Sequence, residues 1–576
     1  MFLSHVDIAN FRGIASLNIA FHSGINVLIG ENATCKTAVL DALRLGLSFA
    51  LEQRDLYVDP QDFYTDDSGN RATAITIALT FSGVEATERG AYYEMLDVLP
   101  DGVPVLRLHV RFTSDGDRIR RTVSGGAGEG QPIPPQVLEL LYYTHLGALR
   151  DATRDLSPRR ANRLSQLFLK LIPEIRAREA LAAALNTQVR AAADWQAVLN
   201  RATQAIQNHL GQIVLQGDNT TVGIEFVDAT FREIVEELRL YIPRQPATKG
   251  DPTTQTTPVQ HRFSIAQNSL GYNNLLYIAA VLGDLIERKQ RQTHSYAALL
   301  IEEPEAHLHP HWQNTLFRYL NVMQEHRVQV FVSSHSPTIT AKSELDALIV
   351  LRRNGQELIA TPIRRLPFSE GSKRYLQRFL DVTKSQLFFA RAVILVEGIS
   401  EALLLPTFAK LMGDAFDLDK NGIEVINIGG VAFAPFAELF NSAAPDQRLG
   451  TRCAIITDDD RGAGQEASAR AAKALDLRSG LVEVFLGRET FEYELCTLNP
   501  EIMRSTYQEL HPRTDLSPAS GDDYARAFVE KIKANEDKAI LAQRLAGKVS
   551  DQDEFVVPDY IRRAIRWATG RNVTTN

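Results

Sequence analysis

The chain has 576 residues, of which 44% are hydrophobic and 23% are charged, and its formal net charge is -8. A single hydrophobic core rarely serves a chain of this length, so we expect two or more domains. The acidic balance excludes a protein that is basic over its whole surface, although local patches and bridging metal ions can still hold the phosphates of a nucleic acid.

The sequence also argues against a membrane or secreted protein. No apolar run approaches the roughly 18 residues that a membrane span needs, and the start of the chain carries an early aspartate, Asp7, without a long apolar segment. The three cysteines, Cys35, Cys453 and Cys496, lie far apart and form no zinc or disulfide framework. We therefore expect a cytoplasmic protein with no membrane association.

The first part of the chain shows strand patterns around one helix. Residues 2–30 alternate apolar and polar side chains in three runs, which predicts strands. A tight loop at 30–37 and a helical pattern at 38–53 follow. Two further alternating runs, at 72–81 and 105–113, predict strands of the same sheet.

The remainder of the chain alternates between helices and strands. Residues 157–210 have an uninterrupted helical pattern, which predicts an inserted arm, and a polar loop spans 243–261. Short apolar strands alternate with helices in 273–334 and again in 391–487. Such alternation is typical of parallel sheets with helices on their faces. The chain is therefore predicted to contain two α/β units in series.

The loop at 30–37 reads GENATCKT and matches a phosphate-binding loop in all but one position. Its backbone N–H groups, including those of Gly30 and Asn32, would wrap the phosphates of a nucleotide. Lys36 would reach the β- and γ-phosphates, and the hydroxyl of Thr37 would bind Mg²⁺. Cys35 stands where the pattern has its second glycine, and because its Cβ crowds the loop, we expect binding to survive and hydrolysis to slow.

Three further motifs belong to the same prediction. Glu302 and Glu303 end an apolar strand, where the first acid would hold Mg²⁺ and the second would orient or deprotonate the attacking water. Ser269 and Gly271 open a helix and would cap a γ-phosphate bound to an opposite subunit. His335 ends another buried strand, close to where a γ-phosphate would lie.

Taken singly, a Ser-x-Gly pair is more often a helix cap, and a histidine at a strand end is more often structural. The order of the four motifs, each at a strand or helix edge, favours a nucleotide site. This order resembles that of ABC-type ATPases of the SMC/RecF kind. The resemblance extends to Asn10-Phe11-Arg12 and implies that Arg12 lies near the nucleotide base.

Acidic residues follow two strands of the second α/β unit. Glu397 ends one apolar strand, Glu401 comes four residues later, and Asp458 and Asp460 end another strand. The ends of parallel strands meet at one edge of a sheet, so these carboxylates would converge there. Clustered carboxylates repel one another unless cations neutralise them. Oxygen ligands suit Mg²⁺ or Mn²⁺, and two such ions can clamp a phosphodiester.

This arrangement resembles the Toprim domain of topoisomerases, primases and nucleases. The cysteines cannot form the zinc ribbon of a primase, and no space remains for a topoisomerase gate. An ATPase ahead of a Toprim domain resembles the OLD-family (overcoming lysogenization defect) nucleases, which include the ATPase of Gabija-type antiphage systems. The resemblance covers nearly the whole chain and includes the stretch at 149–151.

The resemblance implies roles for individual residues. Glu397 and Glu401 match the first acidic pair, with Glu397 as a metal ligand or general base, and Asp458 and Asp460 match the later metal ligands. Glu492 best matches a further acid of the family, with Glu494 as a near rival. The late lysine that would stabilise the charged transition state is matched better by Lys538 than by Lys548.

The predicted fold class is therefore α/β, with an ABC-type (SMC/RecF-like) ATPase that carries a helical insertion and is followed by a Toprim domain. We expect the following division: residues 1–155 and 246–385 for the two parts of the ATPase, 156–245 for the helical insertion and dimerisation arm, and 386–576 for the Toprim nuclease domain with its helical C-terminus.

The predicted function is a metal-dependent DNA endonuclease that nicks or cuts under regulation by ATP and that acts in defence against phage. Its cofactors would be ATP and two Mg²⁺ or Mn²⁺ ions, and its partners DNA and a second copy of the chain in a homodimer or higher oligomer. The resemblance leaves room for a helicase-like partner protein. The alternative is an ATP-sensing DNA-bridging or recombination-mediator ATPase that does not cleave.

Overall fold

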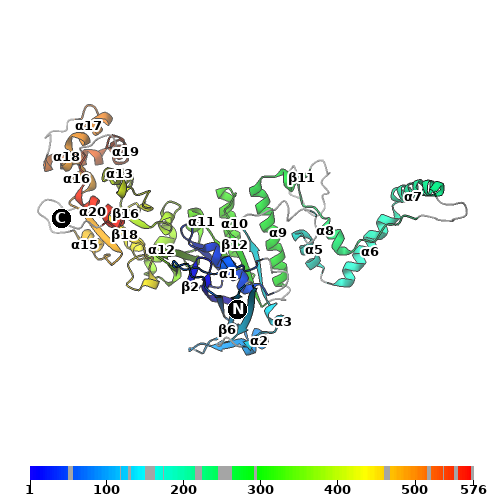
Figure 1. The fold of residues 1–576 in the computed structure, drawn as a ribbon. Coiled ribbons are helices and arrows are strands. Elements are labelled where there is room, and N and C mark those ends of the chain that lie inside the picture. Colours follow the sequence, from blue (N-terminus) through cyan, green and yellow to red (C-terminus); the bar gives the residue numbers. More distant parts are fainter. Residues whose placement is uncertain are drawn as a thin grey trace.

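The structure is a computed structural model, drawn in Figure 1. It describes residues 1–49, 56–100, 102–116, 118–126, 131–148, 158, 162–172, 174–213, 223–243, 262–290, 295–459, 468–514, 521–535, 537–549 and 555–571. In these ranges no helix is long and apolar enough to cross a membrane.

An antiparallel sheet forms the outer layer of the ATPase. Its strands in the described residues run in the order β2-β1-β4-β6-β7-β8, with β5 paired to β6. The bounds are β1 Phe2–Phe11, β2 Ile14–Ala20, β4 Ala74–Ser82, β5 Leu96–Val98, β6 Pro104–Asp115, β7 Arg118–Gly125 and β8 Gln131–Pro132. The alternation at 72–81 and 105–113 thus correctly predicted β4 and β6.

A mostly parallel sheet forms the second layer and carries the nucleotide motifs at its edge. The strand order is β15-β14-β3-β13-β12-β9, with only β14 and β15 antiparallel among the described pairs. The bounds are β3 Ile25–Ile29, β9 Leu141–Leu146, β12 Tyr296–Glu302, β13 Gln329–Ser333, β14 Leu348–Asn354 and β15 Glu357–Pro362. β3, β12 and β13 consist almost wholly of buried residues, as expected for strands covered on both faces.

Helix α1 (Lys36–Leu47) lies between the two sheets. One apolar cluster joins its buried residues to the inner faces of both layers, for example Leu43 to Ile77 and Leu300. On the other face of the parallel sheet lie α9 (Leu270–Gln290) and α10 (Pro310–Val322), beside the short helix α11 (Pro337–Lys342). The packing of α1 on both sides holds the phosphate-binding loop firmly at the end of β3.

The described residues of the predicted helical insertion form four helices, and the insertion extends away from the sheets (Figure 1). The helices are α5 Arg163–Leu171, α6 Ile175–Ala191, α7 Ala193–Ile213 and α8 Phe231–Glu236, followed by the short strands β10 Tyr241–Pro243 and β11 Arg262–Ser264. On α6, Leu181, Leu185 and Val189 are exposed at four-residue spacing. This spacing places them on one face of the helix.

The Toprim unit has a parallel sheet in the order β17-β16-β18-β19. Its strands are β16 Ala392–Val396, β17 Ile423–Asn427, β18 Arg452–Asp458 and β19 Val482–Gly487. Its longer helices are α13 Ile399–Leu411, α16 Phe491–Leu498, α17 Pro500–Leu510, α18 Asp522–Ala534, α19 Lys538–Val549 and α20 Asp559–Ala568. One apolar cluster contains Val332 of the ATPase sheet and Val393 of β16, so the core continues from one unit into the other.

These elements confirm the predicted fold class, an ATPase α/β unit with a helical insertion followed by a Toprim α/β unit. The residue numbers at which the sequence analysis divided them stay a prediction.

Candidate functional sites at two sheet edges

The phosphate-binding loop closes around its own lysine. The ammonium of Lys36 donates to the backbone oxygens of Gly30 at 2.8 Å and Glu31 at 2.7 Å. Burial lowers the pKa of Lys36 to about 8, against the opposing effect of nearby carboxylates such as Glu303. Carbonyl oxygens are neutral partners, so an entering phosphate would offer this ammonium a stronger, charge-assisted contact. The side chains of Asn32 and Thr37 are exposed at the loop.

Cys35 adopts the backbone conformation that the missing glycine would have had. Its φ is 59°, in the left-handed region, directly before α1. The thiol finds room beside Gly13, because a Cβ at position 13 would lie only 2.9 Å from the sulfur. A guanidinium nitrogen of Arg353 lies 3.3 Å from the same sulfur. The loop therefore keeps its turn in spite of the added side chain, at a cost on the order of 1 kcal/mol for the left-handed residue.

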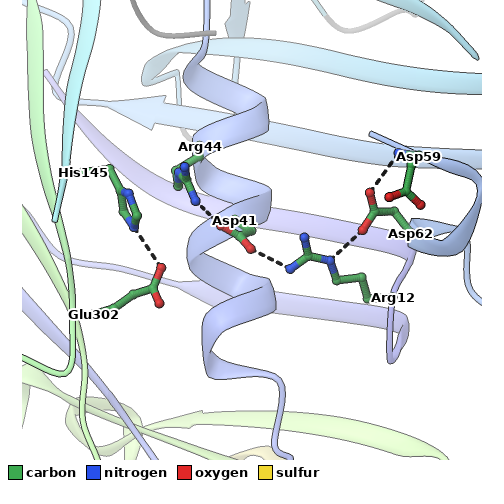
Figure 2. A network of polar contacts seen from close by, with 7 residues as sticks. All are labelled: Arg12, Asp41, Arg44, Asp59, Asp62, His145 and Glu302. Atoms are coloured by element: carbon green, nitrogen blue, oxygen red, sulfur yellow. Dashed lines mark hydrogen bonds and ion pairs between the residues drawn. The ribbon is translucent and has the colours of Figure 1, made fainter. Parts of the chain in front are cut away.

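The acids at the end of β12 are held by neighbours that the sequence did not reveal. Nε2 of His145, on the adjacent strand β9, lies 2.8 Å from Oε1 of Glu302 (Figure 2). Glu303 has a φ of 41°, and its Oε1 lies 3.7 Å from Nε2 of His335. Burial lowers the pKa of His335, and the ammonium of Lys36 lowers it further. These contacts gather the predicted Mg²⁺ acid, the water-orienting acid and the strand-end histidine beside the loop.

Glu305, two residues beyond the predicted acid pair, is buried and supports the same edge. Its Oε1 accepts the hydroxyl of Ser334 at 2.7 Å and the backbone N–H of His335 at 3.0 Å. Burial raises its pKa. Glu305 thereby fixes the turn that carries His335.

Arg12 is anchored in an ion-pair network (Figure 2). Its Nε donates to Asp62 at 2.7 Å, and its Nη1 donates to Asp41 on α1. Asp41 also accepts a bond from Arg44. The network connects the turn after β1 to the helix that follows the phosphate-binding loop. The predicted position of Arg12 near a nucleotide base stays a prediction.

The predicted Ser-x-Gly motif lies at the start of α9. The hydroxyl oxygen of Ser269 accepts the backbone N–H of Tyr272 at 3.4 Å, so the residue caps its own helix. A Cβ at Gly271 would lie 2.3 Å from the backbone oxygen of His307. The glycine is therefore required by packing within the chain, and the contact of Ser269 with an opposite subunit's nucleotide stays a prediction.

The Toprim acids lie together at the carboxyl edge of their sheet. Glu397 follows β16, Asp458 ends the neighbouring strand β18, and Glu401 and Glu492 are buried in the first turns of α13 and α16. Burial raises the pKa of Glu401 to about 7, and Glu492 and Glu397 add to the increase. Burial also raises the pKa of Asp458 well above its ordinary value, together with repulsion from Glu397, Glu401 and Glu492.

Cations of the chain already neutralise part of this charge. Nζ of Lys538, at the start of α19, lies 3.0 Å from the carboxylate of Glu492. Arg470 donates to Oε2 of Glu397, whose Oε1 accepts the hydroxyl of Thr457 and the backbone N–H of Asp458. Within the described ranges, no three side chains of His, Cys, Asp or Glu meet at the spacing of a metal site.

Glu494 and Lys548, the alternatives to Glu492 and Lys538, pair with other residues. Glu494 accepts three bonds from Arg488, including its backbone N–H at 3.0 Å. Lys548 pairs with Glu509 on α17 at 2.6 Å. The structure therefore brings Glu492 and Lys538 into the acidic cluster. Asp460, the remaining predicted ligand, lies outside the described residues, as does the segment 149–151.

Sequence reasoning missed His145, Arg470 and Thr457, which contact the predicted acids. No local motif marks any of them, although Thr457 lies directly before Asp458. Only the pairing of β9 with β12 brings His145 opposite the end of the acid-bearing strand.

Comparison with known proteins gives an ATPase match ahead of a Toprim match. Residues 388–460 match the family described as "Overcoming lysogenization defect protein-like, TOPRIM domain", and residues 142–340 match the "AAA ATPase domain". Residues 1–116 match a family of unknown function.

Three relatives are similar in sequence to parts of this chain. YbjD of Escherichia coli, itself uncharacterized, is 24% identical over 83% of this chain and 82% of its own length. Endonuclease GajA of Bacillus cereus is 22% identical over 54% of this chain, and the match spans about half (54%) of GajA. The OLD nuclease of Thermus scotoductus is 26% identical over 27% of this chain and 30% of its own length.

Fold, site and matches together define an ATPase domain joined to a Toprim domain, which is the composition of an ATP-binding nuclease. The chain is a relative of the OLD nucleases, and its Toprim domain is of the OLD-like type.

Proposed function

We propose that this chain is a divalent-cation-dependent DNA endonuclease whose cleavage is regulated by ATP at the phosphate-binding loop, and that it acts in defence against phage. The observation that carries the proposal is the convergence of Glu397, Glu401, Asp458 and Glu492 beside Lys538. The defence role rests on the resemblance to Gabija-type systems.

The donor set consists of carboxylate oxygens, which suit a divalent cation, and its described members would have to draw closer together around the ion. Buried carboxylates that raise one another's pKa are destabilised as anions, and a divalent cation would relieve that repulsion. Glu397, Glu401, Asp458 and Glu492 would hold the ion or ion pair, with Asp460 as a further ligand. Bound Mg²⁺ or Mn²⁺ would neutralise the phosphodiester and lower the pKa of water.

The chain's own residues then have separate tasks. Thr457 and the backbone of Asp458 hold one oxygen of Glu397, so its other oxygen can face a ligand or accept a proton once Arg470 moves away. Lys538 would stabilise the charge that develops on the phosphate oxygens.

A direct contact joins the phosphate-binding loop to the start of the strand that leads to the Toprim acids, and this contact supports regulation by ATP. Glu31 of the phosphate-binding loop pairs with Arg391 at 3.2 Å. Arg391 immediately precedes β16, and β16 leads into Glu397. A change in the loop on nucleotide binding would therefore act on the strand that positions a catalytic acid.

A homodimer would complete the ATPase in this proposal. Ser269 is exposed at the start of α9, where it can meet the nucleotide of a second subunit, and the exposed apolar residues of α6 would lie in the contact. Light scattering with and without ATP tests this, and a monomer in both conditions would contradict it. A helicase-like partner stays a further prediction.

The deciding experiment is cleavage of supercoiled plasmid by the purified full chain with Mg²⁺ or Mn²⁺, with and without ATP. We expect nicked or linear product from the wild type and none from Glu397→Ala. Glu494→Ala is the matched control, because that acid pairs with Arg488 and should leave cleavage unchanged. The lanes with ATP give the direction of regulation.

A second candidate is an ATP-sensing, DNA-bridging or recombination-mediator ATPase without cleavage. Two observations favour it: Arg470 and Lys538 already pair with the Toprim acids, and Cys35 replaces a loop glycine. If neither protein cuts under any condition while the wild type binds ATP and bridges DNA, this candidate replaces the nuclease.

A further inference from the structure

A cavity of about 670 Å³ lies between the phosphate-binding loop and the Toprim unit. Loop residues 31–34 and the hairpin of β14 and β15 form its ATPase wall. Segments before β16 and β18 form its Toprim wall. Lys36 and Thr37, which face the predicted nucleotide, are not among the described residues that line it. The cavity therefore borders loop residues 31–34 but not the two residues that are predicted to hold the terminal phosphates and Mg²⁺.

The cavity is strongly cationic. Its lining contains four arginines, namely Arg352, Arg353, Arg391 and Arg448. Among its described lining residues, Glu31 is the one carboxylate, which leaves an excess of three positive charges. Like charges this close repel one another, so the cavity favours an anionic occupant.

Two of these guanidinium groups, those of Arg391 and Arg448, still have N–H donors that could bind an anion. Arg391 pairs with Glu31, and Arg448 donates to the backbone oxygen of Ser442 at 2.9 Å. Both bonds use only part of a group that has five N–H donors.

Of the four arginines, Arg352 has the strongest need for an anionic partner. It is half-buried, and no hydrogen bond or ion pair joins its guanidinium group to a described residue. Desolvation lowers its pKa, with Glu31 as the opposing charge. A Cβ at Gly450 would lie 2.4 Å from its Nη2, so the group reaches the backbone of the Toprim unit. A desolvated cation without a direct partner is costly until an anion pairs with it.

The shape and the walls narrow the class of anion. Guanidinium groups match phosphate oxygens in a two-point contact. The volume falls within the range of pockets for small ligands, and Ile359 and Leu481 add apolar surface that a planar base can cover. We propose that this interdomain cavity is a second nucleotide-binding site, which takes a free nucleoside di- or triphosphate through Arg352, Arg391 and Arg448.

Such a ligand would hold the two units together, because its contacts come from both walls. Occupancy would stabilise the junction at Arg391, directly before the strand that leads into Glu397. Only this regulatory consequence rests on the proposed nuclease function. Binding itself does not depend on cleavage.

The test is calorimetric titration of the full chain with ADP. We expect two sites per chain in the wild type and one in Lys36→Ala, which loses the loop site. Adding Arg352→Ala and Arg448→Ala to Lys36→Ala should weaken the remaining site about 10- to 100-fold. Arg374→Ala, at an exposed arginine (83%) on another helix, is the matched control and should leave both sites intact.

Folding of the variants is checked by thermal melting without ligand. Arg352→Ala should melt at or above the wild-type temperature, because it removes an unpaired desolvated cation. Loss of all ADP binding in Lys36→Ala, or an unaltered second site in the folded arginine variants, would overturn the proposal. Displacement of ADP from Lys36→Ala by a 5′-phosphorylated oligonucleotide at far lower concentration would also overturn it, in favour of a DNA end. A chain that never cuts DNA but binds two ADP molecules would refute the nuclease and retain this site.

Discussion

The two sheet edges of this molecule pose opposite electrostatic problems. At the phosphate-binding loop the buried ammonium of Lys36 donates to neutral carbonyl oxygens, and the carboxylates near it, such as Glu303, make no direct contact. At the Toprim edge several buried carboxylates repel one another and lack a cation, and Lys538 and Arg470 relieve only part of that repulsion. The same structural position, the carboxyl end of a parallel sheet, can therefore suit a ligand of either charge. The side chains that the turns place at this edge decide whether the site suits an anion or a cation.

The largest effect should come from removing a cation at the Toprim edge. Lys538→Ala should slow plasmid cleavage by about 10²–10³-fold, because the developing charge loses its fixed partner. Lys548→Ala, whose ammonium pairs with Glu509 on the outer side of α19, should cut at the wild-type rate. Equal losses in both variants, measured by single-turnover cleavage, would show that Lys538 has no special position.

At the edge of the ATPase sheet, the contact that holds Glu302 can be removed by changing His145. His145→Ala should reduce ATP hydrolysis about 10- to 100-fold, since Glu302 loses the neighbour that orients it. ATP binding should persist, because Lys36 is untouched. His109→Ala, on the outer sheet, is the control and should hydrolyse ATP normally. Loss of binding together with hydrolysis would instead mean that His145 shapes the whole pocket.

The burial of Glu401, together with repulsion from the other Toprim acids, should appear as a stability gain when this acid is neutralised. The folded pKa of Glu401, about 7, exceeds its ordinary value of 4.5. Its contribution to stability is therefore present at low pH and lost as pH rises toward 7. Without metal at about pH 8, Glu401→Gln should raise the free energy of unfolding by about 1–3 kcal/mol.

Chemical denaturation in EDTA measures this gain. At about pH 5 the gain should largely disappear, because Glu401 is then already protonated in the folded chain. A variant that is less stable than the wild type at both pH values would contradict the picture of mutually repelling acids.

The smallest effect concerns the loop position that departs from its pattern. Cys35→Gly should change the free energy of unfolding by less than about 1 kcal/mol, because relief of the left-handed side chain and the added entropy of glycine oppose each other. ATP hydrolysis should rise, because the substitution removes the side chain that we expect to slow it. A fall of several degrees in melting temperature would show that the contact of Cys35 with Arg353 contributes more than the strain costs.

Local patterns in the sequence determined much of this protein. Period-two spacing and short apolar runs identified β1–β4, β6, β12, β13 and the four Toprim strands, but not β5, β7, β8, β9, β14 or β15. The motif order located Lys36, Glu302, Glu303 and His335 at one sheet edge, and Glu397, Glu401 and Asp458 at another. The positions of these residues follow from a few neighbours at the end of a strand or the start of a helix, and their roles stay predictions.

Only the tertiary structure decided the contacts between distant segments. Glu492 differs from Glu494, and Lys538 from Lys548, through packing that brings α16 and α19 to the sheet edge. His145 meets Glu302 because β9 pairs with β12 across 157 residues of sequence. The arginine cavity is invisible to any local pattern, since its walls come from segments that meet only when the ATPase and Toprim units pack on one continuous core.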